Sequence, residues 1–162
     1  MEAVTIALGS NLGDKRKTLI EAGKFLESIS ANPIVKSSLW KSEPVGPSKY
    51  EFLNAVVKIF TTDEPKILLN KLKEYEHQAG REKNPKRWAP RILDLDIIQF
   101  GNLVIQKESL IIPHQEYSRR LFVLLPMQET SPDWQDPVTG DTIQKMIENA
   151  PLIQIDKTDF SW

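Results

Sequence analysis

The residue types best suited to chemistry lie close together between residues 87 and 98, where the sequence reads RWAPRILDLDII. Asp94 and Asp96 stand two positions apart among apolar residues. In a strand, both carboxylates would therefore project from the same face, with Cα atoms roughly 7 Å apart. The apolar residues that alternate with them would point into the core. Carboxylate oxygens held in this way suit Mg²⁺, which keeps water or phosphate oxygens as its remaining ligands.

Two arginines precede the aspartates in this stretch. Arg87 and Arg91 each carry a planar guanidinium that can make two parallel hydrogen bonds to a phosphate group. An Asp-x-Asp tripeptide by itself is explained more simply as the polar face of an edge strand. Asp is a poor strand former, however, so its position between aliphatic residues and next to arginines favours a metal and phosphate site.

The chain is nearly neutral, but its charge is unevenly distributed. Its 162 residues carry a formal net charge of −1, with 21 Lys and Arg against 22 Asp and Glu. This balance does not indicate bulk binding to nucleic acid or to an anionic membrane. Residues 81–91 contain five basic residues against one acidic residue, and residues 129–162 contain seven acidic residues against two basic ones. The basic segment could hold an anion, and a solvated loop is the alternative interpretation.

The composition is typical of a soluble folded domain. Hydrophobic residues make up 40% and charged residues 27% of the chain, and the length fits one domain over residues 1–162. No apolar run approaches the roughly 18 residues of a membrane span, and no leader segment is evident. Cysteine is absent, which excludes disulfides, thiolate metal sites and cysteine nucleophiles. We expect a cytoplasmic protein.

The spacing of apolar residues predicts the elements that must position these groups. Strands are predicted at Val4–Leu8, Ile34–Lys41, Phe52–Thr61, Ile92–Phe100, Leu103–Ile105 (as the hairpin partner of the preceding strand) and Leu110–Ile112. Helices are predicted at Lys15–Ser30, over residues 62–79, at Ser118–Leu125 (ended by Pro126) and at Thr142–Asn149. Ile153 and Ile155 could add one further strand near the C-terminus.

The order of these elements predicts an α+β fold. Its first part reads β-α-β-β-α-β, the order of a ferredoxin-like sandwich with an antiparallel-rich sheet. Helices would cover one face of that sheet and leave the other partly available for a ligand, and a C-terminal helical extension would follow. This architecture hosts many activities, so the site rather than the fold must indicate the function.

The stretch at 87–98 resembles the signature of the 6-hydroxymethyl-7,8-dihydropterin pyrophosphokinase family, whose members are enzymes of folate biosynthesis. Other segments resemble the family's motifs in the same order along most of the chain. They are GSNLG (9–13), EPVGP (43–47), FLNAV (52–56), Glu76 with Gly80 and Arg81, Pro113 with His114, and RLFVL (120–124). Several motifs in one order favour a true relationship over coincidence.

The resemblance implies a reaction and a magnesium requirement. Pyrophosphate would pass from ATP to the hydroxymethyl group of the reduced pterin, giving AMP and the pterin diphosphate. Asp94 and Asp96 would hold two Mg²⁺ ions against the triphosphate, and the metals would lower the pKa of the attacking hydroxyl. Arg81 and Arg91 would join the aspartates as catalytic residues by stabilising transition-state charge. Such a reaction depends on positioning and electrostatics rather than on a covalent intermediate.

The resemblance also implies which residues bind the two substrates. The predicted ATP-binding residues are Glu76, Lys83, Trp88, Arg91, Ile97, His114 and Arg120. The predicted pterin-binding residues are Ser42, Val45, Phe52, Asn54, Asp94 and Phe122. Phe52 and Phe122 would stack on the ring, Asn54 would bond to its edge, and Trp88 would seal the site when the loop at 81–90 closes. Contacts to adenine and to the outer phosphates stay open where the chain departs from the family pattern, at Lys73, Ala89, Ser109 and Gln115.

Three other interpretations of the same residues remain open. A nucleic-acid-binding module fits a ferredoxin-like sheet with a basic loop, although the net charge and the lack of an aromatic-rich motif disfavour it. A two-metal nuclease or nucleotidyl transferase would use the same aspartates but usually needs a third carboxylate. The aspartates could also be structural ion-pair partners of Arg87 and Arg91. Pterin-dependent formation of AMP, by a protein that we expect to be a monomer, would separate the pyrophosphokinase from all three.

Overall fold

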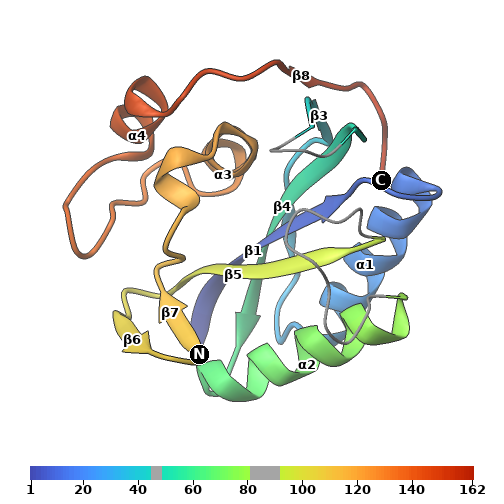
Figure 1. Cartoon of the computed structure of the whole chain (residues 1–162). Helices are drawn as coiled ribbons and strands as arrows, with labels where there is room; N and C mark the ends of the chain where they lie inside the picture. Colours follow the sequence, from blue (N-terminus) through green and yellow to red (C-terminus); the bar gives the residue numbers. More distant parts are fainter. Residues whose placement is uncertain (45–48, 81–91) are drawn as a thin grey trace.

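An antiparallel sheet runs through the centre of the protein (Figure 1). The structure, a computed structural model, describes residues 1–44, 49–80 and 92–162. The strands of this sheet are β1 (Glu2–Ser10), β2 (Val35–Lys36), β3 (Trp40–Ser42), β4 (Phe52–Thr61), β5 (Asp94–Phe100) and β8 (Ile155–Lys157). They lie in the order β5-β1-β4-β3-β8, with β2 also pairing with β4, and every pair is antiparallel. The predicted α+β class is confirmed.

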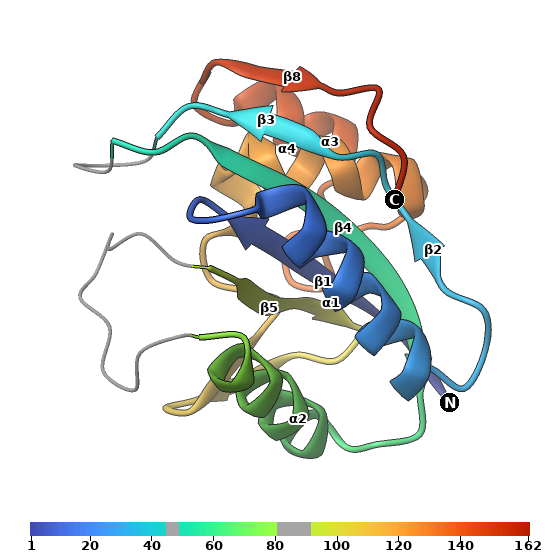
Figure 2. The ribbon, with the colours of Figure 1, turned by 90° about the vertical axis from the view of Figure 1, so that its right-hand side faces the viewer.

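Helices cover both faces of this sheet. The first face carries α1 (Lys15–Ile29) and α2 (Pro65–Gln78), and the second carries α3 (Leu121–Thr130) and α4 (Ile143–Asn149) (Figures 1 and 2). The second face is covered only in part, since Asp94, Asp96 and Phe52 on that face keep some exposure. The C-terminal helices pack on the second face because strand residues on that face are also apolar and must be buried.

Each face of the sheet has its own hydrophobic core. The first core combines inward-facing strand residues with the apolar stripes of α1 and α2, and it includes Leu93, Leu95 and Ile97, as strand alternation predicted. The second core joins Val56 and Ile98 of the sheet to residues of α3, α4 and the short 3-10 helix at Tyr117–Arg119. The aspartates that alternate with Leu95 and Ile97 consequently belong to the second face.

A β-bulge interrupts β5 just beyond these aspartates. Ile6 pairs with Ile97, whereas Thr5 pairs with Gln99, so Ile98 is an extra residue in β5. The bulge changes which face the following residues occupy. Phe100 consequently returns to the first core.

Two predicted strands differ from those in the structure. The predicted strand Ile34–Lys41 is two short strands, β2 and β3. Ser37 lies between them, and its hydroxyl oxygen accepts a hydrogen bond of 2.9 Å from the backbone N–H of Val56. The prediction that Leu103–Ile105 pairs with β5 is also wrong. The backbone N–H of Leu103 instead donates a hydrogen bond to the carbonyl of Phe100, which forms a turn. The hairpin forms instead between β6 (Ile105–Lys107) and β7 (Leu110–Ile112).

Helix α3 continues past Pro126, which was predicted to end it. A proline inside a helix removes one backbone hydrogen bond and usually bends the helix. Burial against the second core outweighs this loss, since most of the helix is apolar. The buried residues are Leu121, Val123, Leu124, Pro126, Met127 and Thr130.

The C-terminal tail crosses the sheet edge and ends beside α1 (Figures 1 and 2). Ile155 lies in β8, which pairs with β3, so the further strand predicted near the C-terminus is present. Nη2 of Arg16 donates a hydrogen bond of 3.0 Å to the carbonyl of Ser161, and the indole N–H of Trp162 donates one of 2.8 Å to the carbonyl of Ser37. The tail is thus attached to both α1 and the edge of the sheet.

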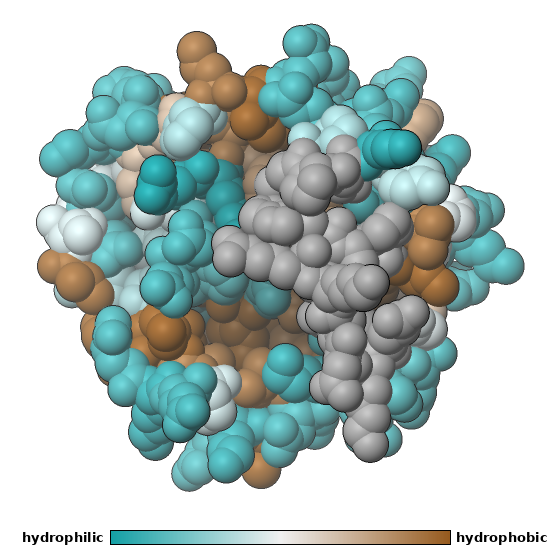
Figure 3. All heavy atoms as spheres, viewed as in Figure 1, coloured by the Kyte–Doolittle hydropathy of each residue, from teal (hydrophilic) through white to brown (hydrophobic). Residues whose placement is uncertain are grey.

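The surface on the side seen in Figure 3 carries mainly hydrophilic side chains, and hydrophobic side chains occupy smaller, separate areas. Within the part of the chain that the structure describes, no helix has the length and apolar character needed to cross a bilayer.

Candidate active site

One row of paired residues crosses the second face of the sheet. Asn54 of β4 and Asp94 of β5 both pair with Gly9, which lies between them in β1. Paired residues project from the same face of a sheet with Cα atoms about 4.5–5.5 Å apart. The ring of Phe52 adjoins this row, since its nearest atom would be 3.7 Å from a Cβ atom at Gly9. An amide, a carboxylate and an aromatic ring therefore surround a residue without a side chain.

The two aspartates share this face, as predicted. Asp96 pairs with Ala7 of β1, which packs against the second core. Both aspartates are partly exposed, whereas Leu95 between them is buried in the first core. The strand β1 therefore places only a hydrogen atom and a methyl group opposite the two carboxylates.

The amide of Asn54 is held by β3. Its side chain is buried, and Nδ2 donates hydrogen bonds of 2.8 Å to Oγ of Ser42 and 3.3 Å to the carbonyl of Trp40. Oδ1 would lie 3.7 Å from a Cβ atom at Gly9. Ser42 and Trp40 thus orient Asn54 so that its acceptor atom borders the space above Gly9.

Aromatic and basic side chains come from the start of α3, which packs on β4. The guanidinium carbon of Arg120 lies 5.6 Å from the centre of the Phe122 ring, a distance at which a cation is attracted to the ring face. Phe122 is half-buried and packs against the second core, and Phe52 of β4 is also half-buried. The two predicted stacking residues therefore lie on elements that pack together.

His114 lies near Asp96 and Arg120. The pKa of His114 is lowered from its ordinary value, mainly because the ring is buried. The carboxylate of Asp96 raises this pKa, the guanidinium of Arg120 lowers it further, and the carboxylate of Glu116 raises it. Nδ1 accepts a hydrogen bond of 3.1 Å from the backbone N–H of Glu116, so a neutral ring carries its proton on Nε2. The backbone N–H of His114 donates to the carbonyl of Ile98 at 2.9 Å, which attaches this histidine to β5.

Glu76 and Ile97 both lie beneath the face that carries the aspartates. Glu76 of α2 is only 2% exposed, and Oε2 accepts a hydrogen bond of 2.7 Å from the backbone N–H of Leu95. Ile97 is 4% exposed and lies in the first core. Both residues support β5 in this structure, and their predicted contacts with ATP stay predictions.

The sequence does not single out two residues of the site, Gly9 and Trp40. Gly9 opens the GSNLG segment, and a glycine at the end of a strand can signal close approach of a ligand. Trp40 gave no signal, because its contact with Asn54 depends on the pairing of β3 with β4.

Several predicted site residues lie outside the described residues. They are Val45, Arg81, Lys83, Trp88 and Arg91. The predicted closure of the loop at 81–90 and the alternative ion pairs of the aspartates with Arg87 and Arg91 also fall there.

The donor atoms of Asp94 and Asp96 fit a hard cation such as Mg²⁺. Within residues 1–44, 49–80 and 92–162, no three or more His, Cys, Asp or Glu side chains form a group that could hold a metal. Mg²⁺ commonly completes its ligand set with water or phosphate oxygens. The same finding gives no support to the third carboxylate that a two-metal nuclease would need.

A pocket of about 290 Å³ adjoins the site at Phe52 and extends to the start of α1. Its lysines have partners: Nζ of Lys15 donates a hydrogen bond of 3.1 Å to the carbonyl of Glu51, and Nζ of Lys41 lies 3.9 Å from the carboxylate of Glu51. These contacts do not indicate a second anion site.

Together, the side chains on this face have the features of a metal-dependent phosphoryl-transfer enzyme. Paired carboxylates, a histidine and an arginine suit a metal-bound phosphate group, and the neighbouring amide and aromatic rings suit a flat polar ring. Comparison with known proteins agrees with this class. A model of the family described as 7,8-dihydro-6-hydroxymethylpterin-pyrophosphokinase (HPPK) matches residues 5–132, and the chain belongs to this family, as its motifs predicted.

Curated relatives include enzymes of similar length. The chain is 42% identical over 130 residues to the 2-amino-4-hydroxy-6-hydroxymethyldihydropteridine pyrophosphokinase of Haemophilus influenzae, with 79% of this chain and 81% of the relative covered. It is 41% identical over 126 residues to the enzyme of the same name from Bacillus subtilis, with 76% and 75% covered.

Solved structures of longer proteins share the fold. The alignment to the HPPK-DHPS of Plasmodium falciparum with pteroate has a TM-score of 0.71 and 15% identity, and it covers 91% of this chain and 42% of the longer one. A second HPPK-DHPS structure, in complex with substrates, gives a TM-score of 0.70 at 13% identity, with 91% and 43% covered. The chain thus spans less than half the length of these solved structures.

Proposed function

We propose that the row formed by Asn54, Gly9 and Asp94 marks the place where this chain performs its family's reaction. That reaction transfers pyrophosphate from ATP to the hydroxymethyl group of 6-hydroxymethyl-7,8-dihydropterin and gives AMP and the pterin diphosphate, a step of folate biosynthesis. Family membership supports the activity, which agrees with the prediction made from the motifs. The register that sets an oriented amide beside a carboxylate supports the location.

We assign magnesium to the aspartate pair. Asp94 and Asp96 would hold two Mg²⁺ ions, which when bound neutralise phosphate charge and lower the pKa of the attacking hydroxyl. The carboxylates keep their relative position because Leu95, the residue between them, is fixed by both the first core and Glu76.

The phosphate side of the site uses His114 and Arg120. A neutral His114 with its proton on Nε2 is a hydrogen-bond donor, and the guanidinium of Arg120 adds a fixed positive charge. We further assign ATP contacts to Glu76, Ile97, Lys83 and Trp88, and stabilisation of transition-state charge to Arg81 and Arg91, on the motifs alone.

The pterin side of the site uses the amide and the aromatic rings. Oδ1 of Asn54 would accept a hydrogen bond from the edge of the heterocycle, because its Nδ2 donors already bond to Ser42 and Trp40. Phe52 and Phe122 would stack on the ring, which adds roughly 0.5–1.5 kcal/mol beyond the burial of apolar area. Ser42 acts here through Asn54, and the backbone at Val45 would complete the edge contacts.

We also propose the finer structural assignments. The strand order β5-β1-β4-β3 with α1 and α2 on one face supports a ferredoxin-like arrangement. Two cores on one sheet support a single pyrophosphokinase domain over residues 1–162. A monomer and a cytoplasmic location stay predictions.

The decisive experiment measures AMP formed from ATP and Mg²⁺ with and without the reduced pterin. We expect AMP only when both substrates are present, and a roughly 100-fold or larger loss in Asp94→Asn and Asp96→Asn. Asp133→Asn, which changes an exposed aspartate, is the matched control and should keep its rate. ADP as product, or turnover without pterin, would contradict the proposal.

A further inference from the structure

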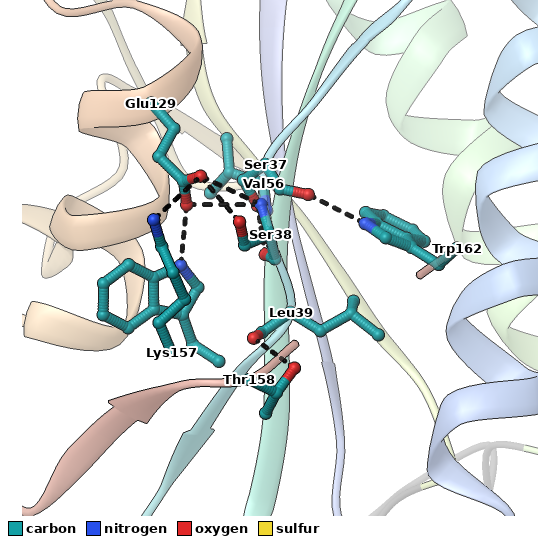
Figure 4. Close-up of polar contacts among 9 residues, drawn as sticks. Ser37, Ser38, Leu39, Val56, Glu129, Lys157, Thr158 and Trp162 are labelled. Atoms are coloured by element: carbon teal, nitrogen blue, oxygen red, sulfur yellow. Dashed lines mark hydrogen bonds and ion pairs between the residues drawn. The ribbon is translucent and has the colours of Figure 1, made fainter. Parts of the chain in front are cut away.

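The carboxylate of Glu129 in α3 gathers hydrogen-bond donors from the edge of the sheet (Figure 4). Its oxygens accept hydrogen bonds of 2.8 Å from Oγ of Ser38, 3.2 Å from the backbone N–H of Ser38 and 2.8 Å from the indole N–H of Trp40. Nζ of Lys157 in β8 lies 3.9 Å from Oε2. A surface glutamate normally has few fixed partners, so this concentration of donors at one side chain needs an explanation.

The contacts of Glu129 lead directly to the amide of the site. Glu129 bonds to the side chain of Trp40, and the carbonyl of the same Trp40 accepts from Nδ2 of Asn54 at 3.3 Å. Trp40 also pairs with Asn54 in the sheet. Strand β3 pairs with β4 on one side and with β8 on the other. The bond from Glu129 adds an attachment to α3 at the side chain of Trp40, the residue whose carbonyl holds Asn54.

Glu129 lies on the same helix as Phe122, one of the two rings proposed to stack on the pterin. It follows Phe122 by seven residues in α3, and residues seven apart project from nearly the same side of a helix, about 10 Å apart along its axis. A bond from Glu129 to β3 therefore restricts rotation of α3 about its axis. That rotation would swing the ring of Phe122 and the guanidinium of Arg120 stacked on it.

We infer that Glu129 is a positioning residue for pterin recognition, setting the orientation of the Asn54 amide and of the Phe122 ring through its bonds to Trp40 and Ser38. The inference rests on the proposed function, because it concerns how the same site recognises its heterocyclic substrate. Glu129 does not itself touch the reacting groups. Its loss should therefore act on the binding of the pterin and much less on that of ATP.

The test compares substrate constants in Glu129→Ala, Glu129→Gln and Trp40→Phe. We expect Glu129→Ala to raise KM for the pterin roughly 5-fold or more, with KM for ATP within about twofold and kcat less affected than KM. Glu129→Gln keeps one acceptor oxygen but turns an NH₂ group toward donors, so its effect should be intermediate. Trp40→Phe removes the indole donor, and in the Glu129→Ala background it should add little, since the acceptor is already gone.

A matched control separates positioning from general stability. Thr142→Ala removes the hydroxyl that accepts from the N–H of Lys145 at the start of α4, far along the chain from β3, and should lower stability without changing KM for the pterin. Urea unfolding gives the free energy of unfolding of each variant, so that their stabilities can be compared. If Glu129→Ala loses as much stability as Thr142→Ala but keeps the wild-type KM for the pterin, the inference is overturned.

Failure of the inference can be distinguished from failure of the proposed function. A wild-type protein that forms no pterin-dependent AMP refutes the function, whatever the variants do. If Glu129→Ala does not fold, Glu129→Gln and Trp40→Phe still decide the matter: an unchanged KM for the pterin in both variants would also overturn the inference.

Discussion

The buried carboxylate of Glu76 accepts a hydrogen bond of 2.7 Å from the backbone N–H of Leu95, the residue that separates Asp94 from Asp96. Strand β5 lies at the end of the strand order, so the outward-facing backbone groups of this segment have no neighbouring strand in the described part of the sheet. Glu76 supplies an acceptor in place of a strand. The pair of aspartates is consequently fixed from α2 as well as from β1.

This contact predicts a stability difference between two glutamates of α2. Glu76→Ala should lower the free energy of unfolding by about 1–3 kcal/mol, because it leaves a buried N–H without its acceptor. Glu76→Gln should lose less, since its side-chain carbonyl can still accept. Glu74→Ala, at an exposed position of the same helix, should stay within about 0.5 kcal/mol of wild type. Urea unfolding measures all three, and equal stability of Glu76→Ala and Glu74→Ala would refute the contact.

Gly9 predicts a loss of substrate binding without a loss of stability. A Cβ atom at this position would be 3.7 Å from both Oδ1 of Asn54 and the ring of Phe52, which is ordinary contact distance. Gly9→Ala should therefore fold as stably as wild type. Its methyl group would occupy the space beside the Asn54 amide and should raise KM for the pterin roughly 10-fold or more. Isothermal titration with the pterin measures its affinity, and urea unfolding measures the stability. An unchanged affinity would show that the pterin ring does not bind beside Gly9.

The environment of Tyr117 leads us to expect that the free energy of unfolding depends on pH in alkaline solution. The pKa of Tyr117 is raised well above its ordinary value of 10.0, mainly because the phenol is buried. Its hydrogen bond to Asp136 and the negative charges of Asp136 and Asp141 raise it further. Above pH 10 the unfolded chain loses this proton while the folded chain keeps it. The stability that it contributes is therefore complete below pH 10 and falls by about 1.4 kcal/mol per pH unit above it.

The variant Tyr117→Phe isolates this contribution. It should be less stable than wild type at pH 7, by about 1–3 kcal/mol, because Asp136 loses the phenol as a partner. Between pH 9 and pH 11 it should lose about 1 kcal/mol less stability than wild type does. Urea unfolding at the two pH values gives both numbers. Parallel losses in the two proteins would show that Tyr117 ionises normally in the folded state.

The C-terminal tail predicts a stability effect outside the segment that the family model matches. A Cβ atom at Gly23 of α1 would lie 3.2 Å from the Trp162 ring, so the indole packs closely on this helix, and its N–H donates to Ser37. Trp162→Ala should lower the free energy of unfolding by about 2 kcal/mol, and Trp162→Phe by about 1 kcal/mol. Leu152→Ala, at a side chain that is 91% exposed, is the control. Wild-type stability of Trp162→Ala would mean that the tail is not attached in solution.

Local spacing was sufficient for much of the architecture. The alternation of Asp94 and Asp96 with leucine and isoleucine predicted which side chains enter the first core. The stripes of α1 and α2 predicted those helices to within a few residues. Periodicity works here because each pattern depends only on backbone geometry within one element.

Local spacing failed where distant segments compete for the same groups. Local spacing predicts that Pro126 ends α3, yet burial of its neighbours against a sheet formed elsewhere in the chain outweighs one lost hydrogen bond. The apolar pattern predicts one continuous strand through Ser37, yet the hydroxyl of Ser37 accepts a hydrogen bond from the backbone of β4, and the strand is divided in two. In both cases a contact with a remote residue decides the local conformation.

From the sequence by itself came the family, the paired carboxylates and the residue types of the site, since these depend on the identity and spacing of neighbouring residues. Only the tertiary structure decided that Gly9 separates Asn54 from Asp94, that Glu76 holds the segment between the aspartates, and that Glu129 reaches Trp40. Each of these relationships joins residues far apart in the chain. The pairing register and helix packing that create them follow from burying two faces of one sheet at once, which no single segment encodes.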